Sequence, residues 1–137
     1  MPEIPAVPAL WRFPAHPASV RRARDAVAEA LPYGLPSRLA ADLALVTSEL
    51  VTNAIRHGDR REDEAVIELV LWPADGHYWL AVSDAGTGKP ELARLGPESE
   101  GGRGLVLIDN LAAAWGVVPR RVRGKSVIAG LSLAQGG

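Results

Sequence analysis

Apolar residues in the first half of the chain recur every three or four positions, which predicts two amphipathic helices. The first spans about residues 17–31, where Pro32 and Gly34 end it. Its apolar face is formed by Val20, Ala23, Val27, Ala30 and Leu31. The second helix is predicted over residues 36–57. Its apolar stripe consists of Leu39, Leu43, Val46 and Leu50.

The remaining pattern predicts short strands around a third helix. The predicted strands comprise residues 10–13, 65–72, 78–84, 116–122 and 126–133. Turns are expected at 73–76, which contains Asp-Gly, and at 123–125. The third helix is predicted over residues 104–115. Residues 85–102 are rich in glycine, proline and charge, so we predict a long loop there, either a functional lid or a disordered segment. This order of elements indicates an α+β fold, a two-layer sandwich of helices on antiparallel hairpins.

Length and composition narrow the class of protein. The 137 residues suit one domain, predicted over 11–137, after a proline-rich segment at 1–10 that is expected to be extended or disordered. The absence of cysteine excludes disulfides and fits a reducing cytosol. A net charge of −1 argues against a nucleic-acid binder. Residues 1–11 show neither a signal peptide nor a membrane span, so we expect a cytoplasmic protein without membrane contact.

The second predicted helix carries a polar pair beside its apolar stripe. Glu49 and Asn53 are four residues apart, so they lie one above the other where the core meets solvent. The asparagine offers a carbonyl oxygen suited to Mg²⁺, and the glutamate can accept a proton. The alternative interpretation is a hydrated polar helix edge.

Two glycine-containing segments follow. Asp84 ends a predicted strand and shares the face of Leu80 and Val82, so its carboxylate should point inward and needs a partner such as an exocyclic amine. Gly86 and Gly88 allow a close backbone approach to a ligand. Before the third helix, the run 101–105 would expose backbone N–H groups suited to phosphate. Each segment alone also fits an ordinary turn or loop.

Taken together, Asn53, Asp84 and Gly102 resemble the three sequence boxes of the GHKL (Bergerat-fold) ATPases. The segments RFPAHPASVRRARDAV, LVTSELVTNAIRHG and GKSVIAGLSL extend the resemblance over nearly the whole chain, to the short anti-sigma-factor serine kinases of bacteria. The resemblance implies a mixed, mostly antiparallel sheet covered on one face by three helices, with residues 85–102 as an ATP lid.

The resemblance also implies a role for each residue of the site. Asn53 would hold the Mg²⁺ that accompanies ATP, Glu49 would be the catalytic base, and Asp84 would bind the adenine amine, with Gly86 and Gly88 nearby. Other nucleotide-binding residues would be Arg56, Gly102, Arg103, Gly104, Leu105 and Ser126. Ser126 stands where relatives often have a threonine that helps hold adenine. Glu100 stands where relatives of the sporulation type have an arginine, which weakens the prediction of phosphoryl transfer.

The partners that the resemblance implies are a sigma factor and an anti-anti-sigma protein phosphorylated on serine, and the implied assembly is a homodimer. Two alternatives remain at this point. One is a nucleotide-binding interaction module that transfers no phosphate. The other is a detached histidine-kinase catalytic domain, which would need a phosphoacceptor histidine on a dimerisation helix; residues 21–30 contain none.

Overall fold

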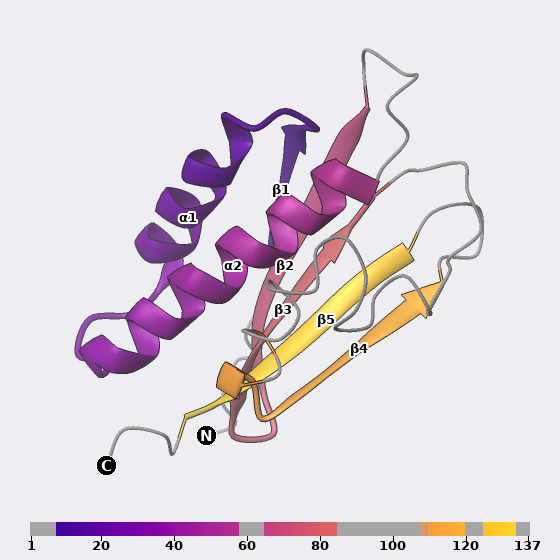
Figure 1. The fold of residues 1–137 in the computed structure, drawn as a ribbon. Coiled ribbons are helices and arrows are strands. Elements are labelled where there is room, and N and C mark those ends of the chain that lie inside the picture. Colours follow the sequence, from indigo (N-terminus) through magenta and orange to yellow (C-terminus); the bar gives the residue numbers. More distant parts are fainter. Residues whose placement is uncertain (1–7, 58–64, 85–107, 109, 120–124, 134–137) are drawn as a thin grey trace.

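The computed structural model describes residues 8–57, 65–84, 108, 110–119 and 125–133. In this part of the chain a five-stranded sheet is covered on one face by α1 (Ser19–Ala30) and α2 (Ser37–His57) (Figure 1). The strands are β1 (Ala9–Pro14), β2 (Val66–Ala74), β3 (His77–Ser83), β4 (Ala114–Pro119) and β5 (Lys125–Ser132). Their order is β1-β2-β3-β5-β4, and each pair of neighbours is antiparallel. The predicted α+β sandwich is confirmed. The sheet was expected to be mixed, but each of these strand pairs is antiparallel.

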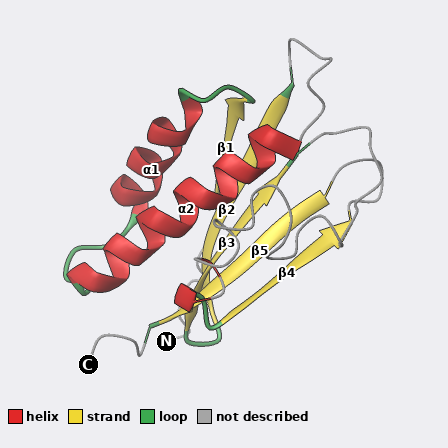
Figure 2. Ribbon diagram, in the orientation of Figure 1, coloured by secondary structure: helices red, strands yellow, loops and turns green. Residues whose placement is uncertain are grey.

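The core lies between the helices and the inner face of the sheet (Figure 2). Alternation along the strands turns Leu69, Leu80 and Val127 toward the helices, where all three are buried. The four residues of the predicted α2 stripe are buried as well. In α1 the buried positions are Ser19, Ala23 and Val27. This spacing of four leaves Ala30 exposed beside the buried face, so its predicted inward position was wrong. No helix in the described ranges is long and apolar enough to cross a membrane.

The β2–β3 hairpin has a tighter turn than predicted. Ala74 pairs with His77, so only Asp75 and Gly76 form the turn. Their φ angles are 53° and 73°, the left-handed backbone that two-residue hairpin turns favour and that aspartate and glycine tolerate. The turn matches the twist of the strands and fixes their register up to Ser83, the last residue of β3.

The third predicted helix ends earlier than expected. Ile108, Asn110 and Leu111 are helical, and the amide of Ala112 donates to the carbonyl of Ile108 at 2.8 Å. Trp115 is already part of β4, opposite Ala129. The predicted helix extended to Trp115, but Trp115 and Val117 alternate inward from β4 as strand residues do. The predicted helix residues 104–107 lie outside the described ranges.

The last hairpin also differs from its predicted limits. β4 begins at Ala114 rather than at residue 116, and Lys125, predicted in the turn, is the first residue of β5. Pairing with β5 explains the earlier start, because Ala114 lies opposite Gly130 and the amide of Ala113 donates to the Gly130 carbonyl at 2.8 Å. Residues 120–124 lie outside the described ranges.

Candidate functional site

The polar residues singled out in α2 and β3 meet at one end of the sandwich. β3 runs antiparallel to β5, so the end of β3 lies beside the start of β5. The C-terminal part of α2 lies over this same end of the sheet (Figure 1). Asn53 is in the second-last turn of α2, and Asp84 directly follows β3. The fold therefore brings together two residues that are far apart in the sequence.

Asn53 is a buried polar side chain on the inner face of α2; the other buried polar residue of this helix, Thr47, donates to the Leu43 carbonyl at 2.7 Å. Only 5% of the Asn53 surface is exposed, and its Nδ2 atom is buried without a hydrogen-bond partner among the residues that the structure describes. Leaving a buried donor unpaired costs about 1–3 kcal/mol, so such groups are rare unless they serve a function. An unpaired amide donor fits a cleft that receives an anionic ligand, and the same side chain carries a carbonyl oxygen suited to a hard cation.

Asp84 is also buried, with 4% of its surface exposed. Continuing the alternation of β3, it follows Leu80 and Val82 on the face toward the helices. A carboxylate in this position accepts hydrogen bonds and donates none when ionised. It can therefore bind an amine or amide N–H group of a ligand.

Glu49 and Arg56 flank Asn53 on α2. Glu49 is half-buried one turn before Asn53, on the same side of the helix, as the spacing predicted. The side chain is therefore not enclosed by the core, so a substrate hydroxyl can approach it. Arg56 is exposed near the end of the helix. These positions allow both side chains to act at the same end of the sheet.

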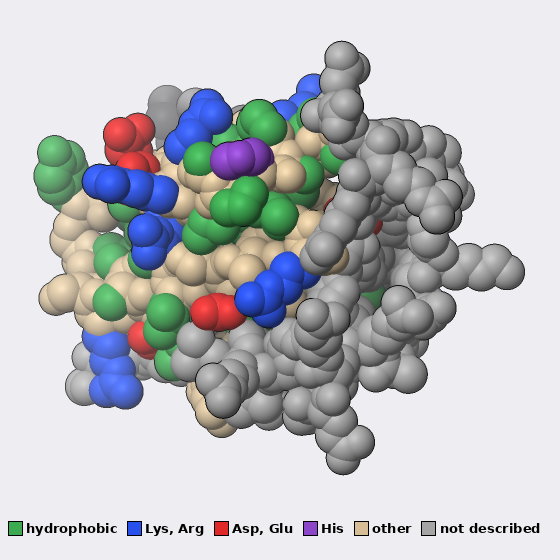
Figure 3. Space-filling view, turned by 45° about the horizontal axis from the view of Figure 1, so that its top comes forward, with side chains coloured by type: hydrophobic (Ala, Val, Ile, Leu, Met, Phe, Trp, Pro, Cys, Tyr) green, Lys and Arg blue, Asp and Glu red, His purple; other side chains and the backbone are tan. Residues whose placement is uncertain are grey.

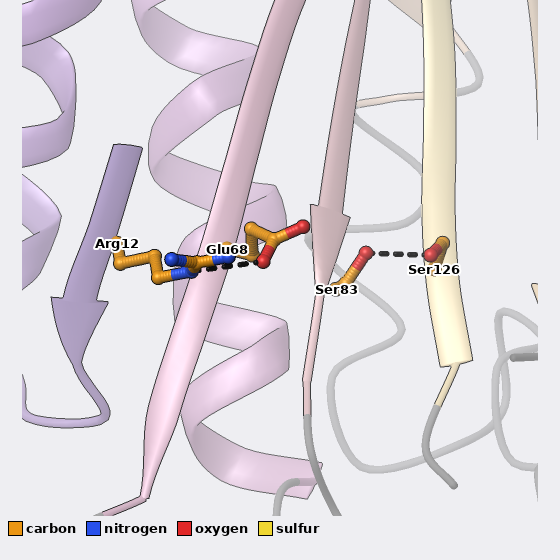
Figure 4. A network of polar contacts seen from close by, with 4 residues as sticks. All are labelled: Arg12, Glu68, Ser83 and Ser126. Atoms are coloured by element: carbon orange, nitrogen blue, oxygen red, sulfur yellow. Dashed lines mark hydrogen bonds and ion pairs between the residues drawn. The ribbon is translucent and has the colours of Figure 1, made fainter. Parts of the chain in front are cut away.

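Ser126 lies apart from these residues. It pairs with Ser83 across β3 and β5, and alternation places both serines on the sheet face away from the helices. Their Oγ atoms are 2.6 Å apart and hydrogen-bonded (Figure 4). The structure therefore does not bring the Ser126 hydroxyl together with Asn53 and Asp84. Ser83 was not predicted as a site residue; the register of a β3–β5 pair is the signal that would have indicated it.

The same cross-strand row continues toward β1. Glu68 lies opposite Ser83, and Arg12 lies opposite Glu68. The Arg12 Nε atom donates to the Glu68 carboxylate at 3.1 Å (Figure 4). This end of the outer sheet face is thus polar across four strands, whereas Trp72 and Trp79 stack on each other near the hairpin turn.

The remaining site residues lie outside the described ranges. They are Gly86, Gly88, Gly102, Arg103, Gly104 and Leu105, together with the predicted lid over residues 85–102. Their predicted contacts with adenine and phosphate stay predictions.

A cavity of about 510 Å³ lies at the opposite end of α2. Its lining comes from the end of α1, the connection between the helices and the start of α2, and includes Leu31, Tyr33 and Ala40. None of the described site residues, Glu49, Asn53, Arg56, Asp84 and Ser126, lines it, so it is separate from the polar end of the sheet.

The chain matches the model of the histidine kinase-like ATPase domain over residues 13–129. It resembles the histidine kinase domain of the blue-light activated histidine kinase EL346 of Erythrobacter litoralis, with a TM-score of 0.59 and 24% identity over 90% of this chain and 63% of that one. A second structure of that kinase gives a TM-score of 0.61 and 25% identity, over 90% of this chain and 43% of the other. The chain thus spans less than two thirds of either protein. No curated protein matches it significantly. The chain belongs to the family of histidine kinase-like ATPase domains, which are ATP-binding domains of the GHKL superfamily.

Proposed function

We propose that this domain binds Mg–ATP at the end of the sheet where β3 ends, and that it acts as an anti-sigma factor with serine kinase activity toward an anti-anti-sigma protein. The observation that carries the nucleotide site is the burial of two polar residues, Asn53 and Asp84, at the same end of the core. Asp84 would accept a hydrogen bond from the adenine amine. The unpaired Asn53 amide would donate to a phosphate oxygen or turn its carbonyl oxygen toward Mg²⁺.

The phosphoryl transfer itself needs little covalent chemistry from the protein. ATP would supply the phosphoryl group, and Mg²⁺, which Asn53 would hold, would supply positive charge that neutralises the phosphates. Glu49, half-buried on the same side of α2, would accept the proton of the attacking serine hydroxyl. The serine oxygen gains the phosphoryl group and ADP is released.

The proposed sigma-factor surface is the solvent face of α1, away from the nucleotide. The exposed charged residues of α1 are Arg21, Arg22, Arg24, Asp25 and Glu29. Basic and acidic side chains alternate with apolar ones on the face seen in Figure 3. A mixed surface of this kind suits a regulated protein partner, which is recognised through charge complementarity. The proposal therefore separates partner binding from the chemistry of the cleft.

Asp84→Asn is expected to weaken ATP binding by at least about tenfold, equivalent to about 1.4 kcal/mol, because the amide presents a donor where the adenine amine needs an acceptor. Isothermal titration calorimetry measures the change. Asp75→Asn is the matched control, since it makes the same substitution at the other end of the hairpin, in a left-handed turn that asparagine tolerates. Wild-type affinity in Asp84→Asn would remove the adenine assignment.

Asn53→Ala is expected to abolish the Mg²⁺ dependence of ATP binding while changing the free energy of unfolding of the nucleotide-free protein by less than about 1 kcal/mol. Loss of packing is offset because the variant also removes a buried unpaired donor. Leu50→Ala, in the same helix and fully buried, should cost about 2–5 kcal/mol. Chemical denaturation and calorimetry with and without Mg²⁺ test both parts. Unchanged Mg²⁺ dependence in Asn53→Ala would contradict the metal assignment.

The likeness to a light-activated histidine kinase favours a second candidate, a histidine-kinase catalytic domain. Labelled ATP incubated with the domain and candidate partners separates the possibilities. A phosphorylated product that is stable in acid indicates serine, whereas an acid-labile product indicates histidine. ATP binding without any labelled product would indicate a nucleotide-binding interaction module.

A further inference from the structure

The hydroxyl pair of Ser83 and Ser126 joins β3 to β5 on the sheet face opposite the helices. The two Oγ atoms are 2.6 Å apart, at the short end of the range for hydroxyl–hydroxyl hydrogen bonds. Ser83 is 8% exposed, so water competes little for this bond at the Ser83 end. Figure 4 shows the two side chains pointing toward each other across neighbouring strands.

This hydrogen bond lies at the very end of β3, directly before Asp84. Ser83 and Ser126 form the last register pair between β3 and β5 on this side, and the chain leaves the sheet at the next residue, Asp84. On the far side of β3, Ser83 lies opposite Glu68, which is held by Arg12. The Ser83–Ser126 hydrogen bond therefore ties the end of β3 to β5, immediately before the carboxylate assigned to adenine.

We infer that Ser83 and Ser126 are positioning residues for nucleotide recognition, which hold the backbone of Asp84 from the face opposite the cleft. This inference rests on the proposed nucleotide site. A hydrogen bond weakens steeply as its distance and angle leave the optimum, so a shifted Asp84 binds the adenine amine less well. In the proposed site the phosphates are held by residues on other elements, so a shift of Asp84 should leave phosphate binding unchanged. Ser126 thus contributes to adenine recognition through β3 rather than through contact with the base.

The test compares Ser126→Thr with Ser126→Val. The two replacements have nearly the same shape and both suit a strand, but only threonine keeps the hydroxyl. Each variant is titrated with ATP and with purine riboside triphosphate, which lacks the exocyclic amine. The ratio of the two dissociation constants measures recognition of that amine by Asp84.

We expect Ser126→Val to reduce this ratio about three- to tenfold, the effect of a typical neutral hydrogen bond, and Ser126→Thr to stay within about twofold of the wild type. Ser83→Ala removes the same bond from β3 and should reduce the ratio as Ser126→Val does. Combining Ser83→Ala with Ser126→Val should add little further loss, since one bond is removed in both cases. Thermal unfolding of each variant checks that the fold is intact.

A purely structural role would weaken both ligands equally in Ser126→Val and leave the ratio unchanged, which would overturn the inference while the nucleotide site stands. An equal reduction in Ser126→Thr would also overturn it, since the hydroxyl would then be irrelevant. A wild-type protein that binds ATP with a ratio near one would remove the Asp84 assignment and this inference with it. A wild type that binds neither compound would overturn the proposed function as a whole.

Discussion

Glu49→Ala is expected to lower the rate of serine phosphorylation by about 10²–10⁴-fold while leaving the dissociation constant for ATP within a few-fold of the wild type. Removal of a general base slows the transfer step, whereas ATP is held by other residues. Glu49 lies one turn before Asn53 on α2 and is half-buried, so its truncation does not open the core. Sigma-factor binding should survive, because the proposed surface near Arg21 and Arg24 is on α1.

The measurement is single-turnover transfer of label from ATP to the anti-anti-sigma partner, with ATP affinity measured in parallel. Glu29→Ala is the control, because it removes a glutamate from the exposed face of α1. Transfer at the normal rate in Glu49→Ala would leave the kinase activity intact but assign the base elsewhere. If the wild-type protein transfers no phosphate to any cognate partner, the kinase proposal fails and the binding module replaces it.

The helix pair and the inner face of the sheet could be predicted because their signals are local. The α2 stripe from Leu39 to Leu50 repeats at helical spacing over about three turns, and every predicted stripe residue is buried. Asp84 could be placed on the helix side because alternation along one strand decides the direction of its side chain. The end of the third helix was harder to predict, since Leu111 and Trp115 suit one helix face as well as a turn followed by a strand.

The position of Ser126 could not be predicted because it depends on register between two strands that are distant in the sequence. A shift of one residue moves every side chain of a strand to the other face of the sheet. The resemblance to nucleotide-binding relatives identified position 126 but not the face on which its hydroxyl lies. The register that pairs Ser83 with Ser126 places this hydroxyl on the outer face of the sheet. It therefore lies beside Ser83, the residue before Asp84, and not beside Asp84 itself.

The outer sheet face contains a second register-dependent feature, the contact of Trp79 with Gly130. The two residues are direct partners in β3 and β5. The Trp79 ring lies so close to Gly130 that a Cβ atom there would be 2.5, 2.7 and 2.8 Å from three ring carbons. The ring is also fixed by its stacking on Trp72 and by a 3.0 Å hydrogen bond from its Nε1 atom to the Ala74 carbonyl. It cannot move aside without losing these contacts.

Gly130→Ala is therefore expected to lower the free energy of unfolding by about 1–3 kcal/mol, the usual cost of overpacking. Gly116→Ala is the matched control. Gly116 lies on the same sheet face in β4, and a Cβ atom there meets nothing within 4 Å. That variant should be neutral or more stable by up to about 1 kcal/mol, because glycine weakens a strand. Urea denaturation of both variants, and of Gly130→Ala combined with Trp79→Leu, assigns the cause. If the cost of Gly130→Ala remains unchanged when Trp79 is leucine, the indole ring is not its source.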